Sequence, residues 1–581
     1  MAIKTGTVVV TGAGIGEGEE AQAEVHKMIS IQKVILNPMD RLCRKVMGLI
    51  VPNGKAVYKT DTIMSPMLIF ISCLLFFLTA LALMTLRLTR LSERFSWLVA
   101  VGGAMLAFTS VFIWLMQMPF SLELPAWQPR SLFVSQILFR ANGLSWPFAL
   151  SIAALTLTML LTAVARPVIA NSYNWVGALA LGGLGLMAVT ADNPLTLLLV
   201  WAALDITELV AQLASVEGAS NNEKVVTSFS TRALGIGILL WANIVSVAQG
   251  SSFDFQSIPA GAGAYLVMAA GLRLGVLPLH LPYSSESTLR RGFGTSLRLI
   301  SAASSLILLA HVPAGSETTF TPFLTAFAIA AALYGGWMWL RAPDELTGRP
   351  YWIIGMGALS VTSALRGNPL GAVAWGCALI LVGGALFLAS VQQVWLNRVL
   401  LIGIWSLSAL PFSMTASAWL GNSGFFLPFG IAAQSLLAAG FVRHALRPSG
   451  RDTFESQPGW ARSVYPAGIL LLIACQITLG FIGWDGALQI GAWLPSILAS
   501  LLTFGLVWAT PRFRTFNPIR AHWVTPISSG MDNFYGSFWA VYRVFSRIGN
   551  TITEALEGEG GIMWTLLFIV IFISLLTQGS H

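Results

Sequence analysis

Residues 193–213 read NPLTLLLVWAALDITELVAQL, a run that is apolar over most of its length and carries two carboxylates, Asp205 and Glu208. A helix of this length, rising about 1.5 Å per residue, crosses the ~30 Å hydrocarbon layer of a membrane. Comparable apolar runs recur along the chain from Ser65 onward. The stretch therefore predicts a membrane helix, and its recurrence predicts a protein that crosses the membrane many times.

The overall composition supports the same class of protein. Of the 581 residues, 55% are hydrophobic and 10% are charged, whereas a soluble domain carries about 25% charged residues. Successive spans of about 20 residues fit helices and not the shorter strands of a barrel. We therefore expect an all-α, polytopic transmembrane helical bundle. Arginines in cytoplasmic loops explain the net charge of +8, so no nucleic-acid partner is expected.

Sixteen segments are apolar enough to be spans, and the fifteenth ends near residue 510. They lie near residues 66–86, 97–117, 145–165, 174–191, 194–214, 228–248, 261–281, 295–312, 320–340, 351–366, 369–390, 399–420, 424–445, 465–483, 487–508 and 562–577. We expect a transmembrane core over residues 66–510 and a final transmembrane helix within residues 562–581.

The residues before the first span contain TVVVTGAGIGEG (residues 7–18), which is similar to the phosphate loop of short-chain dehydrogenases. A dinucleotide-binding unit needs repeated strand–helix pairs behind its glycine loop. Residues 19–65 are too few for that sheet, so we expect no nucleotide at Gly12–Gly18. Residues 1–65 are interpreted as a flexible or peripheral N-terminal extension.

The segment 511–561 differs from the spans on either side because it mixes arginines with aromatic residues, such as Arg543 and Trp539. From about Asp532 its apolar residues recur at helical spacing, which is typical of an amphipathic helix on a membrane surface. We predict a lateral helix on the cytoplasmic side. The alternative is an ordinary basic loop.

Basic residues also indicate how the chain crosses the membrane. They gather in the loops after odd-numbered spans: Arg87, Arg90, Arg94, Arg166, Lys224, Arg290, Arg291, Arg341, Arg349, Arg398, Arg447, Arg451 and Arg462. The positive-inside rule places these loops in the cytoplasm of a cell with the chain in its inner (plasma) membrane. Arg130, Arg140 and Arg366 in the alternate loops are exceptions, and the side of residues 1–65 stays open.

No pattern of residues points to a catalytic, cofactor or metal site. The four cysteines (Cys43, Cys73, Cys377 and Cys475) are scattered, without a C-x-x-C pair or a Cys/His cluster. We found no nucleophile–base pair and no cofactor loop. We therefore expect no metal, no cofactor and no catalytic site within this chain.

Ionisable residues inside spans are costly and mark functional sites or ion pairs. The spans contain five of interest: Asp205, Glu208, Arg232, Arg273 and Arg298. The two acids are three residues apart, so they lie on one helical face. Two interpretations remain open, namely a polar path for ions or protons and a structural network that joins helices.

The segment GLRLGVLPLHLP (residues 271–282) predicts a discontinuous helix. Pro278 breaks the helical hydrogen bonds and the nearby glycines permit the break. Broken helices at membrane depth usually border a polar cavity. His280, just past the break, either titrates near neutral pH as part of such a site or is an interfacial histidine.

These residues resemble a known family. Arg273-Leu-Gly-Val-Leu-Pro278-Leu-His280, followed by Thr295-Ser-Leu-Arg298, is similar to the antiporter-like membrane subunits of respiratory complex I (types L, M and N). The same family includes multisubunit cation/proton antiporters and membrane-bound hydrogenases. LFRANGLS (138–145), NPLTLLLVW (193–201) and ALFLAS (385–390) agree in order, and the layout is closest to subunit L. The resemblance covers roughly residues 66–581, and it implies other membrane subunits and the lipid bilayer as partners.

The ionisable positions depart from the family pattern. By this resemblance, the glutamate of the fifth span falls on Ala202, with Asp205 one turn further on, and Asn142 stands for an aspartate. The family's lysine of the seventh span falls on Arg273, and its histidine of the eighth span falls on Arg298. A further lysine falls on Gly383 or Gly384, and a last lysine or acid falls near Trp419. After Lys59 the sequence contains a single lysine, Lys224, which we expect in a loop. A buried lysine can shift its pKa and pass a proton, whereas arginine stays charged.

We therefore expect a membrane subunit of a complex I-like assembly in which the proton path is degraded and no enzymatic step occurs in this chain itself. One alternative is an active proton- or cation-translocating subunit that uses Asp205 and Glu208. Another is the membrane half of an inorganic-carbon uptake system with a peripheral enzyme partner.

Overall fold

The computed structural model describes residues 64–89, 95–124, 136–165, 172–213, 219–250, 254–255, 257–282, 291–313, 320–391, 393–421, 424–447, 458–483 and 493–509. Most of these residues are helical. The α-helices are α2 (Met64–Leu88), α3 (Ser96–Gln117), α4 (Ser145–Thr162), α5 (Ser172–Thr190), α6 (Pro194–Leu213), α7 (Ala219–Ala248), α8 (Ala260–Arg273), α9 (Phe293–Ala310), α10 (Thr321–Arg341), α11 (Glu345–Leu365), α12 (Pro369–Leu388), α13 (Val394–Leu400), α14 (Ile402–Leu407), α15 (Leu427–Ala445), α16 (Gly459–Thr478) and α18 (Trp493–Ala509). The expected all-α polytopic bundle is confirmed.

Fourteen of the sixteen expected spans coincide with these helices, and a fifteenth, 399–420, only partly overlaps α13 and α14. Eleven helices of the described residues are long and apolar enough to cross a membrane. The other four expected spans correspond to the shorter α8, the interrupted pair α13 and α14, the short α18, and α11, which carries Glu345 and Arg349 in its first turns. All of the N-terminal extension 1–65 except Met64 and Ser65 lies outside the described residues. The lateral segment 511–561 and the last span, 562–577, also lie outside them. Lys224, expected in a loop, instead lies within α7.

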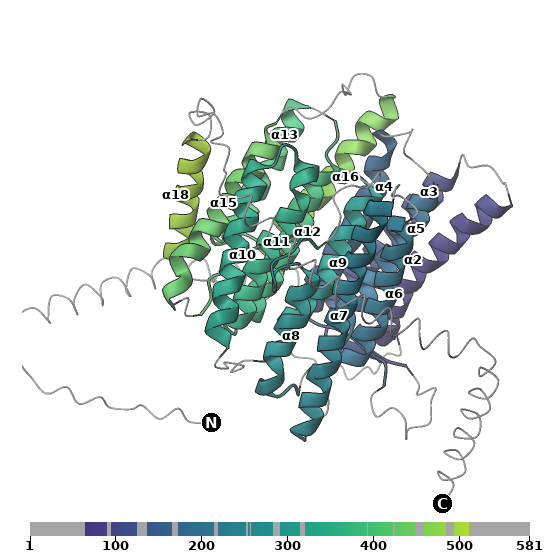
Figure 1. The fold of residues 1–581 in the computed structure, drawn as a ribbon. Helices are drawn as coiled ribbons and strands as arrows, with labels where there is room; N and C mark the ends of the chain where they lie inside the picture. Colours follow the sequence, from purple (N-terminus) through teal and green to yellow (C-terminus); the bar gives the residue numbers. More distant parts are fainter. Residues whose placement is uncertain are drawn as a thin grey trace, which may run out of the picture. The chain divides into compact units, whose positions relative to one another are not determined.

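The helices α4, α9 and α12 form the centre of the bundle. Between 89% and 94% of each of these spans is buried, and α12 packs against α4, α9, α11 and α16. Figure 1 shows the helices standing side by side, with α9 and α12 between the first and last helices of the described chain. By contrast, α2, α3 and α7 expose many apolar side chains, as expected for helices that face lipid or another subunit.

The predicted break in the seventh span is present. α8 ends at Arg273, and residues 274–279 continue as turns. Gly275 has a φ of +74°, and an added Cβ there would lie 2.4 Å from the carbonyl oxygen of His280. The His280 N–H closes the turn by donating to the Gly275 carbonyl at 3.0 Å. The turn therefore requires a glycine at this position.

The expected continuous helix over residues 399–420 is wrong. α13 and α14 are short, and residues 408–420 form turns in which Ala409 and Phe412 have positive φ. Pro411 has no backbone N–H to donate to a helical hydrogen bond. Side chains of other helices therefore hydrogen-bond to backbone carbonyl groups that a continuous helix would have paired internally. Gln434 Nε2 donates to the Leu407 carbonyl at 2.8 Å. Asn368 Nδ2 donates to the Ser417 carbonyl at 2.9 Å.

A short hairpin was not anticipated from the sequence. β1 (Phe120–Glu123) pairs antiparallel with β2 (Leu138–Ala141) in front of α4. The Oδ1 atom of Asn142 then accepts hydrogen bonds from the backbone N–H groups of Leu144 and Ser145. Asparagine and aspartate satisfy the first N–H groups of a helix about equally well. Asn142 therefore satisfies backbone groups at the start of α4.

Close packing of two glycines sets the distance between α10 and α11, and it yields a matched pair of variants. A Cβ added at Gly335 would lie 2.6 Å from the backbone nitrogen of Gly355, whereas at the exposed Gly237 on α7 it would meet nothing within 4 Å. We predict that Gly335→Ala lowers stability by ~1–3 kcal/mol. Gly237→Ala should gain about 0.5–1 kcal/mol. Thermal unfolding in detergent measures both, and equal midpoints for the two variants would contradict the described packing.

Candidate functional site

The two acids of α6 face the interior of the bundle. Asp205 and Glu208 are each 2% exposed, while Ile206 and Val210 on the opposite side of the helix are more than half exposed. The apolar side of α6 therefore faces outward and its acidic side faces inward, as the three-residue spacing predicted.

Arg273, the last residue of α8, forms a bidentate ion pair with Asp205. Its Nη1 lies 2.6 Å from Asp205 Oδ2 and its Nη2 lies 2.8 Å from Oδ1. Its Nε donates to Ser305 Oγ at 3.2 Å, and Nη1 also donates to the carbonyl of Arg232. The guanidinium carbon lies 4.2 Å from the centre of the Trp201 ring. Most of the donors of this guanidinium therefore have fixed partners.

Glu208 forms the second buried ion pair, with Nη1 of Arg232 on α7. Gln212 Nε2 donates to the other carboxylate oxygen at 2.6 Å. Arg232 is also within hydrogen-bond distance of the Ser301 hydroxyl on α9, at 3.4 Å. We call these residues the ion-pair network. It joins α6, α7, α8 and α9 through charged groups that are 5% exposed or less.

Arg298 on α9 lies beside this network and is itself 4% exposed. It lines, together with Glu208, Arg232 and Arg273, a cavity with a volume of only about 10 Å³. A cavity needs roughly 10–15 Å³ to hold one water molecule. This cavity therefore has room for about one water molecule.

His280 and Pro278 hold the broken segment but do not join the network. The ring Nδ1 of His280 lies 2.8 Å from the carbonyl oxygen of Pro278. Ser228 Oγ on α7 donates to the Pro282 carbonyl at 2.6 Å. Within the ranges that the structure covers, no hydrogen bond or ion pair connects His280 to Asp205 or Glu208. The structure thus brings together five of the candidate residues and leaves His280 apart.

A further set of buried charges was missed in the sequence. Arg291 forms an ion pair with Glu345 and donates to the Ala389 carbonyl at the end of α12 at 2.5 Å. Arg349, expected in a cytoplasmic loop, lies inside α11, is 2% exposed and donates to Thr295 Oγ1 at 2.8 Å. The only signal in the sequence is the capping box at Asp344 and Thr347, which marks the start of a helix at Glu345.

The resemblance expects a lysine at Gly383 or Gly384 and a lysine or an acid near Trp419. Side chains of other residues pack closely around all three of these positions. A Cβ at Gly383 would lie 2.5 Å from Trp352 Nε1, and one at Gly384 would lie 2.8 Å from Leu155 Cδ1. Trp419 is 4% exposed and its Nε1 donates to Gln434 Oε1 at 3.0 Å. α12 carries no Asp, Glu, Lys or Arg and is buried over most of its length. A lysine side chain would not fit at either glycine without repacking.

The structure is similar to chains of three solved membrane complexes. A chain of the Mrp complex from Dietzia sp. DQ12-45-1b matches with a TM-score of 0.59 and 12% identity, over 88% of this chain and 63% of that one. A chain of the membrane-bound sulfane sulfur reductase, an archaeal respiratory membrane complex, matches with 0.55 and 13%, over 87% and 99%. A chain of respiratory complex I from Thermus thermophilus matches with 0.53 and 18%, over 76% and 99%.

No protein-family model matches the sequence, and no curated protein sequence matches it. The chain spans less than two thirds of the Mrp chain but nearly the whole of the other two. At these identities the comparisons establish the fold. The chain is a multi-pass membrane protein whose fold is shared by chains of these three complexes, in agreement with the resemblance predicted from the sequence.

The Arg273–Asp205 pair predicts a characteristic pattern of stability. Asp205→Ala leaves a buried guanidinium without its counter-ion and should lower stability by ~3–5 kcal/mol. The double variant Asp205→Leu, Arg273→Met removes both charges and should recover most of that loss. Thermal unfolding followed by size-exclusion chromatography in detergent measures all variants.

The matched control is Glu123→Ala, because Glu123 is an exposed acid on β1. It should change stability by no more than about 0.5 kcal/mol. If the double variant were as unstable as the sum of its single variants, the two residues would not act as a pair.

Proposed function

We propose that this chain is a membrane subunit of a multisubunit, complex I-like assembly, and that its ion-pair network fixes helices and does not relay protons. The fold shared with chains of the Mrp complex, the sulfane sulfur reductase and complex I supports the first part of the proposal. The bidentate Arg273–Asp205 pair is the observation that carries the second part.

A proton relay needs groups that gain and lose a proton at moderate cost. Arginine remains protonated at any pH that a cell reaches. Arg273 keeps its charge, so its position depends on the Asp205 carboxylate that faces it through two hydrogen bonds. A permanent cation of this kind holds its partner in place and cannot itself pass a proton.

The absence of lysine from most of the chain supports the same conclusion. Lys224 is the one lysine after Lys59. The position at which the resemblance expects a lysine in α12 is Gly383 or Gly384, and both glycines lie against packed neighbours. A buried amine is the group whose pKa shifts readily enough to exchange protons.

We further propose that the protein lies in the inner membrane with the loops after odd-numbered spans in the cytoplasm. Arg341 and Arg398 support this orientation because both are exposed. Arg349 and the partly buried Arg291 do not, because their partners are protein groups inside the bundle.

Proton flux in proteoliposomes tests the relay. The chain reconstituted alone, with an imposed membrane potential and a pH-sensitive dye, should give no flux above empty liposomes. Asp205→Asn should be indistinguishable from the native chain. Flux that exceeds empty liposomes and is abolished by Asp205→Asn would support the alternative, an active translocating subunit.

Affinity purification from native membranes after mild cross-linking tests the assembly. We expect the chain to co-purify with other multi-pass membrane proteins at fixed stoichiometry. Isolation of the native chain as a single species, with no cross-linked membrane partner, would contradict the subunit proposal.

A further inference from the structure

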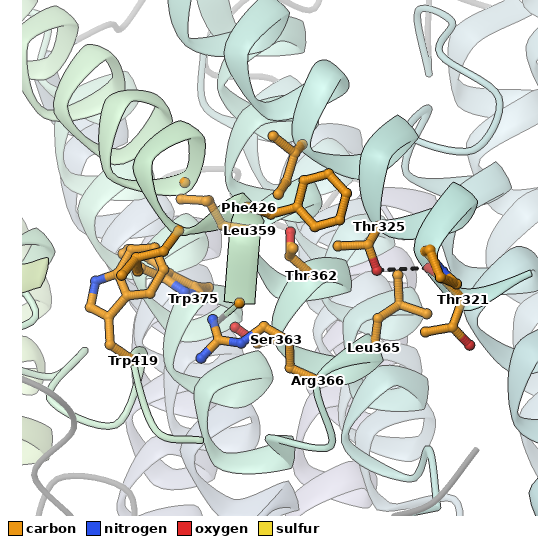
Figure 2. Close-up of a pocket in the computed structure, with 15 residues that line it drawn as sticks. Thr321, Thr325, Leu359, Thr362, Ser363, Leu365, Arg366, Trp375, Trp419 and Phe426 are labelled. Atoms are coloured by element: carbon orange, nitrogen blue, oxygen red, sulfur yellow. Dashed lines mark hydrogen bonds between the residues drawn. The ribbon is translucent and has the colours of Figure 1, made fainter. Parts of the chain in front are cut away.

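A larger cavity lies away from the ion-pair network, between α10, α11, α12 and the start of α15. Its volume is about 390 Å³, which falls within the range of about 300–1,000 Å³ of small-molecule sites. No residue of the ion-pair network lines it. Figure 2 shows the side chains around it.

One part of the wall is apolar and aromatic. Trp375 and Trp419 line the cavity and are 2% and 4% exposed, and Leu359 and Phe426 add further apolar surface. Large buried rings favour contact with an apolar body and exclude water from it. The cavity is therefore suited to a ligand with a hydrophobic portion.

The polar part of the wall is centred on Arg366, which directly follows α11. Its Nη2 donates to the Leu420 carbonyl at 2.7 Å and its guanidinium carbon lies 5.5 Å from the Trp419 ring. In Figure 2 the guanidinium lies next to Ser363, on the side of the cavity where Trp419 and Trp375 lie. No carboxylate within the described ranges forms an ion pair with Arg366, unlike Arg273 and Arg232. A guanidinium has five donors and stays charged, so its remaining capacity suits an anionic group.

The surrounding backbone adds to the positive potential. α10 begins at Thr321 and α15 begins at Leu427, and both residues line the cavity. The N-terminal end of a helix carries a partial positive charge and favours anions. None of the described residues that line the cavity is acidic. The C-terminal end of α11 also borders the cavity at Leu365 and carries a partial negative charge. The full charge of Arg366 is therefore the main attraction for an anionic group.

Exposed phenylalanines surround the helix starts at the cavity. Phe320, Phe323 and Phe327 on or next to α10, and Phe425 and Phe429 at the start of α15, are each at least 44% exposed. Such a surface faces lipid in a membrane protein. A ligand that partitions into the bilayer would meet this surface, whereas a purely water-soluble anion would not.

We infer that the cavity binds a single-chain amphiphile with a carboxylate head group, such as a fatty acid. The carboxylate pairs with Arg366 and the chain lies against Trp375 and Trp419. The volume of about 390 Å³ suits one chain and is too small to enclose a phospholipid with two chains. This inference is independent of the proposed subunit function.

Native mass spectrometry of the full chain in a non-ionic detergent tests the inference with dodecanoate as the probe. Dodecanol has the same chain without the charge, and inorganic phosphate has a charge without a chain. We expect dodecanoate to bind saturably at one site, and dodecanol and phosphate to bind at least about tenfold more weakly, because a charge-assisted hydrogen bond is lost in one and the apolar contact in the other.

Arg366→Gln should weaken dodecanoate binding about tenfold or more. Arg341→Gln, at an exposed arginine on the far end of α10, should leave binding unchanged and is the matched control. Because Arg366 also holds the Leu420 carbonyl, Thr325→Leu serves as a second variant that narrows the cavity and leaves that hydrogen bond in place.

The expected result is loss of binding in both Arg366→Gln and Thr325→Leu, with each variant still eluting as the native chain does. Equal affinity for dodecanoate and dodecanol would overturn the role of the charge. Saturation by phosphate alone would overturn the role of the chain. Unchanged dodecanoate binding in both variants would overturn the site itself.

Discussion

A charge inside a membrane protein has to be neutralised by a neighbouring group, and in this chain the pair of Arg273 and Asp205 meets that requirement most completely. Two hydrogen bonds link the charged groups, and Ser305, the Arg232 carbonyl and the Trp201 ring surround the guanidinium. Each of these contacts comes from a different helix or turn than Arg273 itself. The interaction therefore fixes the end of α8, where the helix breaks, against α6, α7 and α9. In a low-dielectric interior such a pair is costly to separate.

The two discontinuous segments show how irregular backbone is accommodated inside the bundle. After α8 the turn closes on itself through Gly275 and is anchored to α7 by Ser228. After α14 the turns are held by Gln434 and Asn368 from other helices. Backbone polar groups away from water need such partners. Of the central helices, α9 packs against α8 and α12 packs against α14. α12 carries no formal charge, and Gly383 or Gly384 stands where the resemblance expects a lysine.

Much of the fold and part of the site could be predicted from the sequence, and the limits have physical reasons. Long apolar runs determine membrane helices almost by themselves, so fourteen expected spans coincide with observed helices. Pro278 correctly predicted a break in the seventh span. The gathering of Asp205, Glu208, Arg232, Arg273 and Arg298 followed from the cost of burying charge. Which arginine pairs with which acid depends on how neighbouring helices are rotated, which composition does not encode. Glu345 was missed because a buried acid at a helix start looks like an ordinary cap. The hairpin was missed because four-residue strands leave almost no periodicity.

The central claim is that the arginines and acids form permanent pairs with no continuous water path through them. A cryo-electron microscopy map of the chain in a lipid nanodisc, at a resolution that shows ordered water, tests this claim most directly. The account predicts at most an isolated water in the small cavity among Glu208, Arg232, Arg273 and Arg298, with both ion pairs closed. A continuous file of waters that passes Asp205 and Glu208 and reaches both faces of the membrane would contradict it.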